Sequence, residues 1–206
     1  MTFKIKDFGR KDYVETYNAM RNFSENRNFY TDDEIWLVEH PSVYTLGLSK
    51  KTEHIIDVGD IPVVATDRGG QVTYHGPGQL VGYPIVDLRP DRCDVRRYMR
   101  DLEEVMIRTA RTFGVTAERV SGLTGVWVGN AKLGAIGVRI SKWITSHGFA
   151  FNVMTDLEYF NLIVPCGIKD RPATSLSALL GRMVSVTEVE QVLTEHFSVV
   201  FDLSVI

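Results

Sequence analysis

The sequence is poor in cysteine: it has only Cys93 and Cys166, which form no CxxC pair and no disulfide framework. It has no apolar run near the roughly 20 residues needed to span a bilayer, and its N-terminal stretch lacks the apolar centre of a signal peptide. Neither a P-loop pattern nor a GxSxG elbow is present, and the histidines are too scattered for metal-ligand spacing. We therefore expect a soluble cytoplasmic protein with no membrane contact, no metal and no nucleotide site.

The remaining composition is ordinary for a folded chain. Of the 206 residues, 44% are hydrophobic and 24% are charged, which excludes disorder and coiled coil. The formal net charge of −3 offers no global field for nucleic acid, so any charged docking must use a local patch. No repeat or Ser/Gly linker marks a domain boundary, and a globular chain of this size can fold without disulfide bonds or a bound metal. We expect one domain over residues 1–206.

Hydrophobic periodicity predicts both strands and helices. Strands are expected at 3–8, 35–40, 43–46, 61–67 (a buried one), 71–75, 79–88, 125–140 and 143–153, and helices at 11–23 and 94–113. Asp94 would cap the second helix at its N-terminus and Gly114 would end it. A last helix is opened by the capping-box pair Thr187 and Glu190. Strands dominate the middle with helices around them, which favours an α+β fold with a mixed, largely antiparallel sheet and flanking helices.

The densest unusual segment is RGGQVTYHGPGQL, residues 68–80. Glycine weakens a strand, so a glycine-rich strand usually indicates the close approach of another backbone or of a ligand. Gly69 and Gly70 would open a slot for a chain, and Arg68 and His75 would bind polar groups at its ends. A strand, a tight turn and a bulge without any ligand would explain this segment equally well.

Two polar residues lie in apolar strands. Lys132 stands two residues before Gly134, and it is either an edge residue that reaches solvent or a buried functional base. The first reading is the commoner one for lysine. His147 precedes Gly148, where a lone histidine is more often a hydrogen-bonded core residue than a catalyst.

Cys166 lies in LIVPCGI, between Pro165 and Gly167. Pro-Cys-Gly is typical of a turn, and a cysteine on a turn with small neighbours is accessible, whereas a structural cysteine is usually buried. It is a candidate nucleophile only if a base lies near it in space, which these residues alone do not show. Cys93, which precedes the helix at 94–113, lacks this setting and is expected to be structural.

Several long segments together resemble one family. RGGQVTYHGPGQLVGYPIVDL, KLGAIGVR, TSHGFAFNV and FNLIVPCGI, in this order, closely resemble the octanoyltransferases of lipoate biosynthesis, the LipB family. WLVEHPSVYTLG at 36–47 fits as well. The likeness runs from about residue 34 to residue 180, and no position expected to carry chemistry departs from it.

The resemblance implies a fold like the catalytic domains of biotin and lipoate ligases, which is class II synthetase-like. It implies an acyl-enzyme mechanism with Cys166 as the nucleophile and Lys132 as its partner, and it implies no cofactor and no metal. It also implies an acyl site lined by three segments. Their residues are Arg68, Gly69, Gly70, Gln71, Val72, Thr73, Tyr74, His75, Ala135, Ile136, Gly137, Gly148, Phe149 and Ala150.

The implied donor is octanoyl-acyl carrier protein, and the implied acceptor is a lysine of lipoyl-domain proteins such as 2-oxoacid dehydrogenase subunits and the glycine cleavage H protein. Transfer from thioester to amide runs downhill, so ATP is not required. Carrier proteins are acidic, so a basic patch is expected at the mouth. Candidates are Arg89, Arg92, Arg96, Arg97 and Arg100, and the pair Arg139 and Lys142, although a solvated face would explain them equally well.

The acyl chain needs a dry slot, and each buried methylene contributes roughly 0.8 kcal/mol, so the length of the slot selects the chain. The glycines and alanines of the three segments would leave room for it. His75 and backbone N–H groups near Gly78 or Gly148 are candidates for stabilising the oxyanion.

Three other functions remain open. An ATP-dependent lipoate or biotin ligase of the same fold would activate a free acid and need no nucleophilic cysteine. A cysteine hydrolase would release free octanoate without an acceptor. An inactive relative would bind acyl groups or lipoyl domains as an adaptor, and such a protein would need neither Cys166 nor Lys132.

Overall fold

The computed structural model describes residues 2–28, 30–49, 52–164, 171–202 and 204–205. Within these ranges the strands form a seven-stranded sheet, in the order β10-β1-β2-β6-β9-β8-β7, and a three-stranded sheet, in the order β4-β3-β5. The large sheet contains β1 (Thr2–Arg10), β2 (Asp33–Glu39), β6 (Gln79–Ile85), β7 (Val126–Val128), β8 (Ala131–Ser141), β9 (Ile144–Asn152) and β10 (Ser204–Val205). The small sheet contains β3 (Val43–Leu46), β4 (Val63–Ala65) and β5 (Val72–His75).

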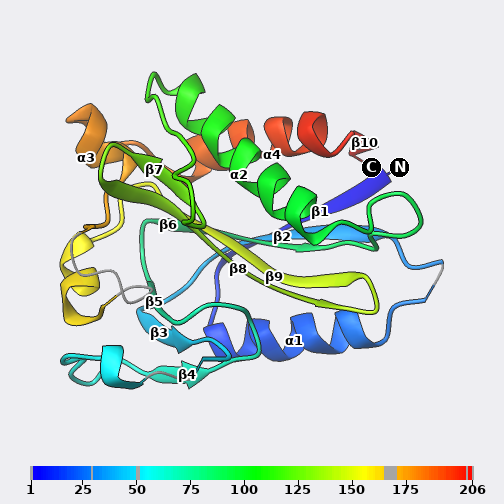
Figure 1. The fold of residues 1–206 in the computed structure, drawn as a ribbon, viewed down its shortest axis with the longest axis horizontal. Coiled ribbons are helices and arrows are strands. Elements are labelled where there is room, and N and C mark those ends of the chain that lie inside the picture. The colour runs from blue at the N-terminus through cyan, green and yellow to red at the C-terminus, as the bar shows by residue number, and fades with distance from the viewer. Residues whose placement is uncertain (1, 29, 50–51, 165–170, 203, 206) are drawn as a thin grey trace.

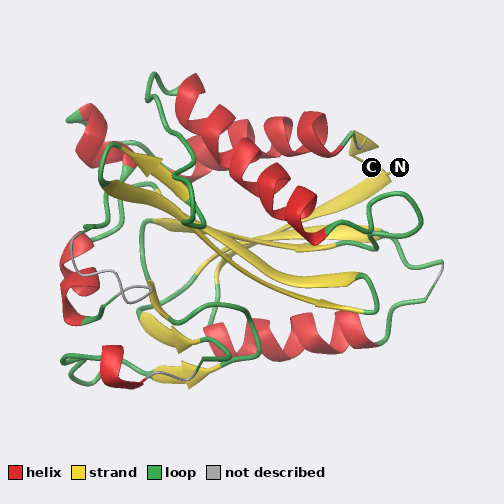
Figure 2. Ribbon diagram, viewed as in Figure 1, coloured by secondary structure: helices red, strands yellow, loops and turns green. Residues whose placement is uncertain are grey.

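The helices flank the large sheet on both faces (Figures 1 and 2). They are α1 (Tyr13–Glu25), α2 (Val95–Thr112), α3 (Leu176–Leu180) and α4 (Val186–Phe201), with short 3-10 segments η1 (Thr52–His54) and η2 (Leu157–Leu162). In the large sheet β1 runs parallel to β2 and β10, and the other neighbouring strands are antiparallel. The α+β fold with a mixed, largely antiparallel sheet is therefore confirmed.

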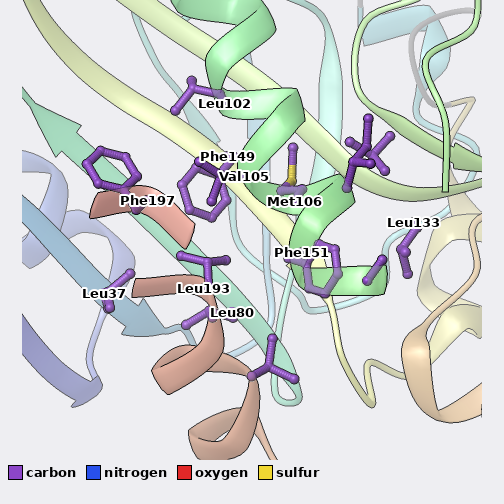
Figure 3. Packing of buried hydrophobic residues seen from close by; sticks show 14 of the residues in the cluster. Leu37, Leu80, Leu102, Val105, Met106, Leu133, Phe149, Phe151, Leu193 and Phe197 are labelled. Atoms are coloured by element: carbon purple, nitrogen blue, oxygen red, sulfur yellow. The ribbon is translucent and has the colours of Figure 1, made fainter. Parts of the chain in front are cut away.

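The helix expected over 94–113 is α2, and its ends form as its sequence predicts. The Asp94 side chain accepts a hydrogen bond from the Arg97 N–H at 3.0 Å, and Gly114 follows the helix with a φ of +83°. Leu102 and Met106 lie on the apolar stripe and are fully buried. Figure 3 shows this stripe packing with α4 side chains against the sheet.

The opposite face of the large sheet is covered by α1 and the small sheet, which lie on the same side of it in Figure 1. Met20 of α1 is fully buried there against Trp36, Val81 and Tyr83 of the large sheet. The small sheet has its own apolar cluster, formed with η2.

Three local predictions were wrong. The strand expected at 125–140 is two strands, β7 and β8, separated by a turn at 129–130. The strand at 61–67 was expected to be buried, but β4 is an edge strand, and Val63 is 40% exposed. The last helix is not opened by Thr187 and Glu190: the Ser185 hydroxyl and the Glu188 carboxylate form the capping box. The helix therefore begins two residues earlier, and Thr187 lies inside its first turn.

Candidate active site

A cavity of about 540 Å³ is lined by residues of both sheets, of α1 and of the first part of α2. Lys132 and all the predicted acyl-site residues except Tyr74 line it. Lys132 and Val138 of β8 both line the cavity, and six residues of strand span about 20 Å. The cavity is therefore long enough for an extended eight-carbon chain.

Tyr74 does not line the cavity. Its side chain belongs to the buried apolar cluster of the small sheet. The Tyr74 ring instead stacks on Tyr159 of η2 with 4.8 Å between ring centroids. We therefore place Tyr74 in the core of the small sheet and not in the acyl site.

The loop at 68–71 forms one wall of the cavity. The buried Arg68 guanidinium donates to the Thr45 carbonyl and to the Gln71 carbonyl, both at 2.8 Å. The Gly69 N–H donates to the Val138 carbonyl at 2.9 Å and so docks the loop on β8. Gly70 has a φ of +88°, which a residue with a side chain rarely adopts. Arg68 therefore shapes this wall by binding the protein's own backbone.

The small residues of β8 and β9 have two different roles. Ala135 pairs with Ala150, and Gly137 pairs with Gly148. A Cβ on Gly148 would lie within 2.1 Å of the Gly82 carbonyl oxygen, so this glycine lets β6 approach β9. The two alanines face the cavity without such a conflict, and they are the side chains that leave room for a ligand.

Lys132 lies at the start of β8 and is half-buried. Its Nζ lies 4.8 Å from the centroid of the buried Trp127 ring. The Arg171 guanidinium lies over the same ring at 5.2 Å. Two cationic side chains thus contact one aromatic ring at this end of the cavity.

Cys166 lies outside the described residues, and its role stays a prediction. The chain that follows it is described from Arg171 onwards. The Lys132 N–H donates to the Pro172 carbonyl at 2.8 Å, and the Thr174 N–H donates to the Lys132 carbonyl at 2.9 Å. Arg171 and Ala173 line the cavity. The segment that returns from Cys166 is therefore bonded directly to the backbone of Lys132.

Cys93 is exposed, in contrast to the usual buried setting of a structural cysteine. Its Sγ lies 3.6 Å from the Leu88 carbonyl oxygen. It does not line the cavity, so it does not compete with Cys166 for the role of nucleophile.

A buried histidine pairs with a partly exposed acid at the other end of the cavity, and the sequence did not indicate the acid. His147 is fully buried, as expected of a hydrogen-bonded core histidine, and its Nε2 lies 2.8 Å from Asp67 Oδ1. Asp67 also accepts from the Tyr17 hydroxyl at 3.1 Å and pairs with Arg139 at 3.2 Å. The hydrogen bond from His147 lowers the pKa of the Asp67 carboxyl to about 2. Burial lowers the pKa of His147, so the imidazole is neutral and donates to an ionised carboxylate.

One of the backbone N–H groups expected to stabilise the oxyanion already makes another hydrogen bond. The Gly78 N–H donates to Glu39 Oε2 at 2.8 Å, and the next N–H, of Gln79, donates to the Gly76 carbonyl. These two N–H groups are therefore already hydrogen-bonded within the protein.

In the described part of the chain, no three His, Cys, Asp or Glu side chains come together as a metal site. In the same ranges, no helix is both long and apolar enough to cross a membrane.

Comparison with known proteins identifies the family. The profile of the lipoyl protein ligase A/B catalytic domain matches residues 12–198. An octanoyltransferase of Solibacter usitatus (strain Ellin6076) is 46% identical over 209 residues, which cover 98% of this chain and 94% of that protein. The chain belongs to the octanoyltransferase family. A second octanoyltransferase, from Xanthomonas campestris pv. campestris (strain 8004), is 47% identical over 178 residues, which cover 86% of this chain and 77% of that protein.

The fold of this octanoyltransferase family member is shared with solved ligases. Lipoate-protein ligase A bound with ATP superposes with a TM-score of 0.84 at 16% identity, covering 100% of this chain and 90% of that one. The bi-partite lipoate protein ligase of Thermoplasma acidophilum gives 0.82 at 18% identity, covering 100% and 86%. These likenesses show the lipoate-ligase fold, and membership of the family makes the protein an acyltransferase.

Proposed function

We propose that the protein moves an octanoyl group from octanoyl-acyl carrier protein to a lysine of a lipoyl domain, through a thioester on Cys166. Octanoyl transfer in lipoate synthesis follows from membership of the octanoyltransferase family. The observation that best supports the mechanism is the position of Lys132. A half-buried cationic side chain lies at one end of a cavity walled by small residues, and its backbone is bonded to the segment that follows Cys166.

The first half-reaction exchanges one thioester for another. The Cys166 thiolate attacks the carrier thioester carbonyl, a carbon–sulfur bond forms, and the carbon–sulfur bond to the carrier breaks. The departing carrier thiolate takes a proton from the Lys132 ammonium. A cation beside a thiol also favours the thiolate, which is the nucleophilic form.

The second half-reaction forms the amide. The neutral amine of the acceptor lysine attacks the Cys166 thioester, the carbon–nitrogen bond forms, and Cys166 departs as a thiolate. The amine loses one proton to the neutral Lys132 amine, which restores the ammonium for the next turnover. No ATP enters either step.

The proposed docking site for the acidic carrier protein is the first part of α2. Val95 and Met99 of this helix line the cavity, and Arg96 and Arg100 lie next to them in sequence and are exposed. Arg139 is a weaker candidate, because it is paired with Asp67. The proposed location is the cytoplasm, where a nucleophilic thiol stays reduced.

The proposed function is tested by mixing the protein with octanoyl-acyl carrier protein and a lipoyl domain, without ATP. We expect octanoylation of the lipoyl-domain lysine, detected as a mass increase of the domain. Strict dependence on ATP with free octanoate would instead identify a ligase, which the shared fold makes the main competitor. Release of octanoate without an acceptor would identify a hydrolase, and binding without any transfer would identify an adaptor.

A further inference from the structure

His75 lies at the head of a chain of hydrogen-bonded side chains that runs across the sheet. Its Nδ1 lies 2.7 Å from Gln79 Oε1. The Gln79 amide nitrogen donates to Asn152 Oδ1 at 2.9 Å and to the Tyr74 carbonyl at 3.3 Å. The Asn152 amide nitrogen donates to the Thr174 carbonyl at 2.9 Å. Gln79 and Asn152 end the HGPGQ and HGFAFN segments, and the proposed mechanism gives neither a role.

Two main-chain carbonyls determine which group donates and which accepts in each of these side-chain hydrogen bonds. The carbonyls of Tyr74 and Thr174 only accept, so each must face an amide NH₂ group. The Asn152 oxygen is then turned to Gln79, and the Gln79 oxygen is turned to His75. An amide oxygen also only accepts, so the proton of the neutral His75 ring must lie on Nδ1.

The other ring nitrogen of His75 is consequently an acceptor. His75 lines the cavity, and within the described ranges its Nε2 has no hydrogen-bond partner. Burial lowers the pKa of His75 to about 3, so the ring stays neutral at physiological pH. His75 therefore cannot donate from Nε2 to an oxyanion, which removes the second of the expected donors.

We propose that His75 positions the attacking amine of the acceptor lysine by accepting one of its N–H groups at Nε2. The Gln79 and Asn152 side chains act through His75 as positioning residues that hold this tautomer. The acceptor amine is the substrate group that suits Nε2, because the acyl chain and its thioester have no donor. With one N–H held by His75, the amine's lone pair is left for the thioester carbonyl. This inference rests on the proposed amine transfer.

The first test reads the tautomer without any substrate. Nitrogen-15 NMR of histidine-labelled wild type, with the His75 signals identified by their loss in His75→Phe, is recorded from pH 5 to pH 8. We expect a protonated Nδ1, an unprotonated Nε2 and no titration. In Gln79→Glu the new carboxylate stabilises the imidazolium, so titration should enter this pH range. A proton on Nε2 in the wild type, or an imidazolium at pH 6, would overturn the proposal.

The second test separates the two half-reactions by rapid quench and intact-protein mass spectrometry. His75→Phe keeps the ring shape but has no acceptor, and His75→Gln places an amide oxygen near the Nε2 position. We expect acylation of Cys166 to stay within about threefold of wild type in both variants. Transfer from the acyl-enzyme should fall about 10- to 100-fold in His75→Phe, the range for one lost hydrogen bond to a buried group, and much less in His75→Gln.

Equal losses in both half-reactions would show that His75 only shapes the cavity, and equal losses in the two variants would show that Nε2 accepts nothing. Either result overturns the proposal. Failure of the wild type to acylate at all would instead contradict the proposed function, while the NMR measurement would still report whether the tautomer is correct.

Discussion

The two faces of the large sheet bury different chemistry. The face under α2 and α4 is a continuous apolar core that includes Leu80, Leu102, Phe151 and Leu193 (Figure 3). The face under α1 and the small sheet buries histidines, tyrosines and amide side chains, several of which line the cavity. Buried polar groups are costly unless they are hydrogen-bonded, so only one of the faces is arranged for stability alone.

This division separates folding from chemistry. On the apolar face the side chains of the core cluster contribute mainly through close packing. On the cavity face His75, His147 and Asp67 are held by specific hydrogen bonds. Substitutions on the first face should therefore change stability and leave transfer intact, whereas those at the proposed catalytic residues of the second face should lower transfer.

The sharpest test of the cavity face is the predicted nucleophile. We expect Cys166→Ala to lower transfer by at least about 1,000-fold, as the loss of a nucleophile does in other covalent enzymes. Cys166→Ser should lose nearly as much, because a hydroxyl ionises far less readily than a thiol. Steady-state transfer to a lipoyl domain measures both, and Cys93→Ala, at an exposed cysteine away from the cavity, is the matched control. Full activity of Cys166→Ala would refute the assignment.

The next largest effect is expected at Lys132. Lys132→Ala should lower transfer by about 100- to 10,000-fold, the usual range for a lost proton carrier, with the melting temperature little changed. Lys4→Ala, at an exposed position on β1 that does not line the cavity, is the control and should behave as wild type. Unchanged turnover together with an unshifted thiol pKa in Lys132→Ala would remove its role.

The apolar face is tested by Leu193→Ala. Leu193 is fully buried, so the substitution should lower the free energy of unfolding by about 2–5 kcal/mol through lost burial and a cavity. Urea unfolding gives this value, and transfer per folded molecule should stay unchanged. A large fall in transfer per folded molecule would contradict the assignment of stability to one face of the sheet and of transfer to the other.

Asp67 gives the cavity face a pH-dependent contribution to stability. Its pKa is lowered from 3.8 to about 2, so the folded state binds this proton less tightly than the unfolded state. The stabilisation is complete above about pH 4 and is lost as the pH falls towards 2. Asp67→Asn should destabilise the fold by about 1–2 kcal/mol at pH 7 and by much less near pH 2. Urea unfolding at both pH values measures this, and an equal cost at both would contradict it.

The smallest effect concerns the choice of chain length. Ala135→Leu should fill part of the cavity and shift preference towards shorter acyl chains, by about fourfold for each excluded methylene. Competition between octanoyl and shorter carrier thioesters reads the shift directly. Ala178→Leu on α3, at an exposed position, is the control. If Ala135→Leu leaves the preference for acyl chain length as in wild type, the acyl chain does not lie along β8.

The elements that the sequence predicted correctly depend on local signals. The apolar stripe of α2, its Asp94 cap and the β8–β9 hairpin each need only neighbouring residues. The capping box was placed wrongly because Ser185-x-x-Glu188 and Thr187-x-x-Glu190 are overlapping patterns of the same kind. Local spacing cannot choose between them.

The parts of the site that the sequence did not predict depend on contacts between distant segments. Asp67 and His147 are 80 residues apart, and the tautomer of His75 depends on Gln79, Asn152 and the Thr174 carbonyl. The exposure of β4 depends on its place at the edge of the small sheet and not on its apolar sequence. Periodicity and motif spacing carry no information about such pairings.

The most direct measurement is the intact mass of the protein after mixing with octanoyl-acyl carrier protein in the absence of an acceptor. The account predicts one added octanoyl group on the wild type, its loss when a lipoyl domain is added, and no adduct on Cys166→Ala. An adduct of equal yield on Cys166→Ala, or octanoylation of the lipoyl domain without any adduct on the enzyme, would contradict it.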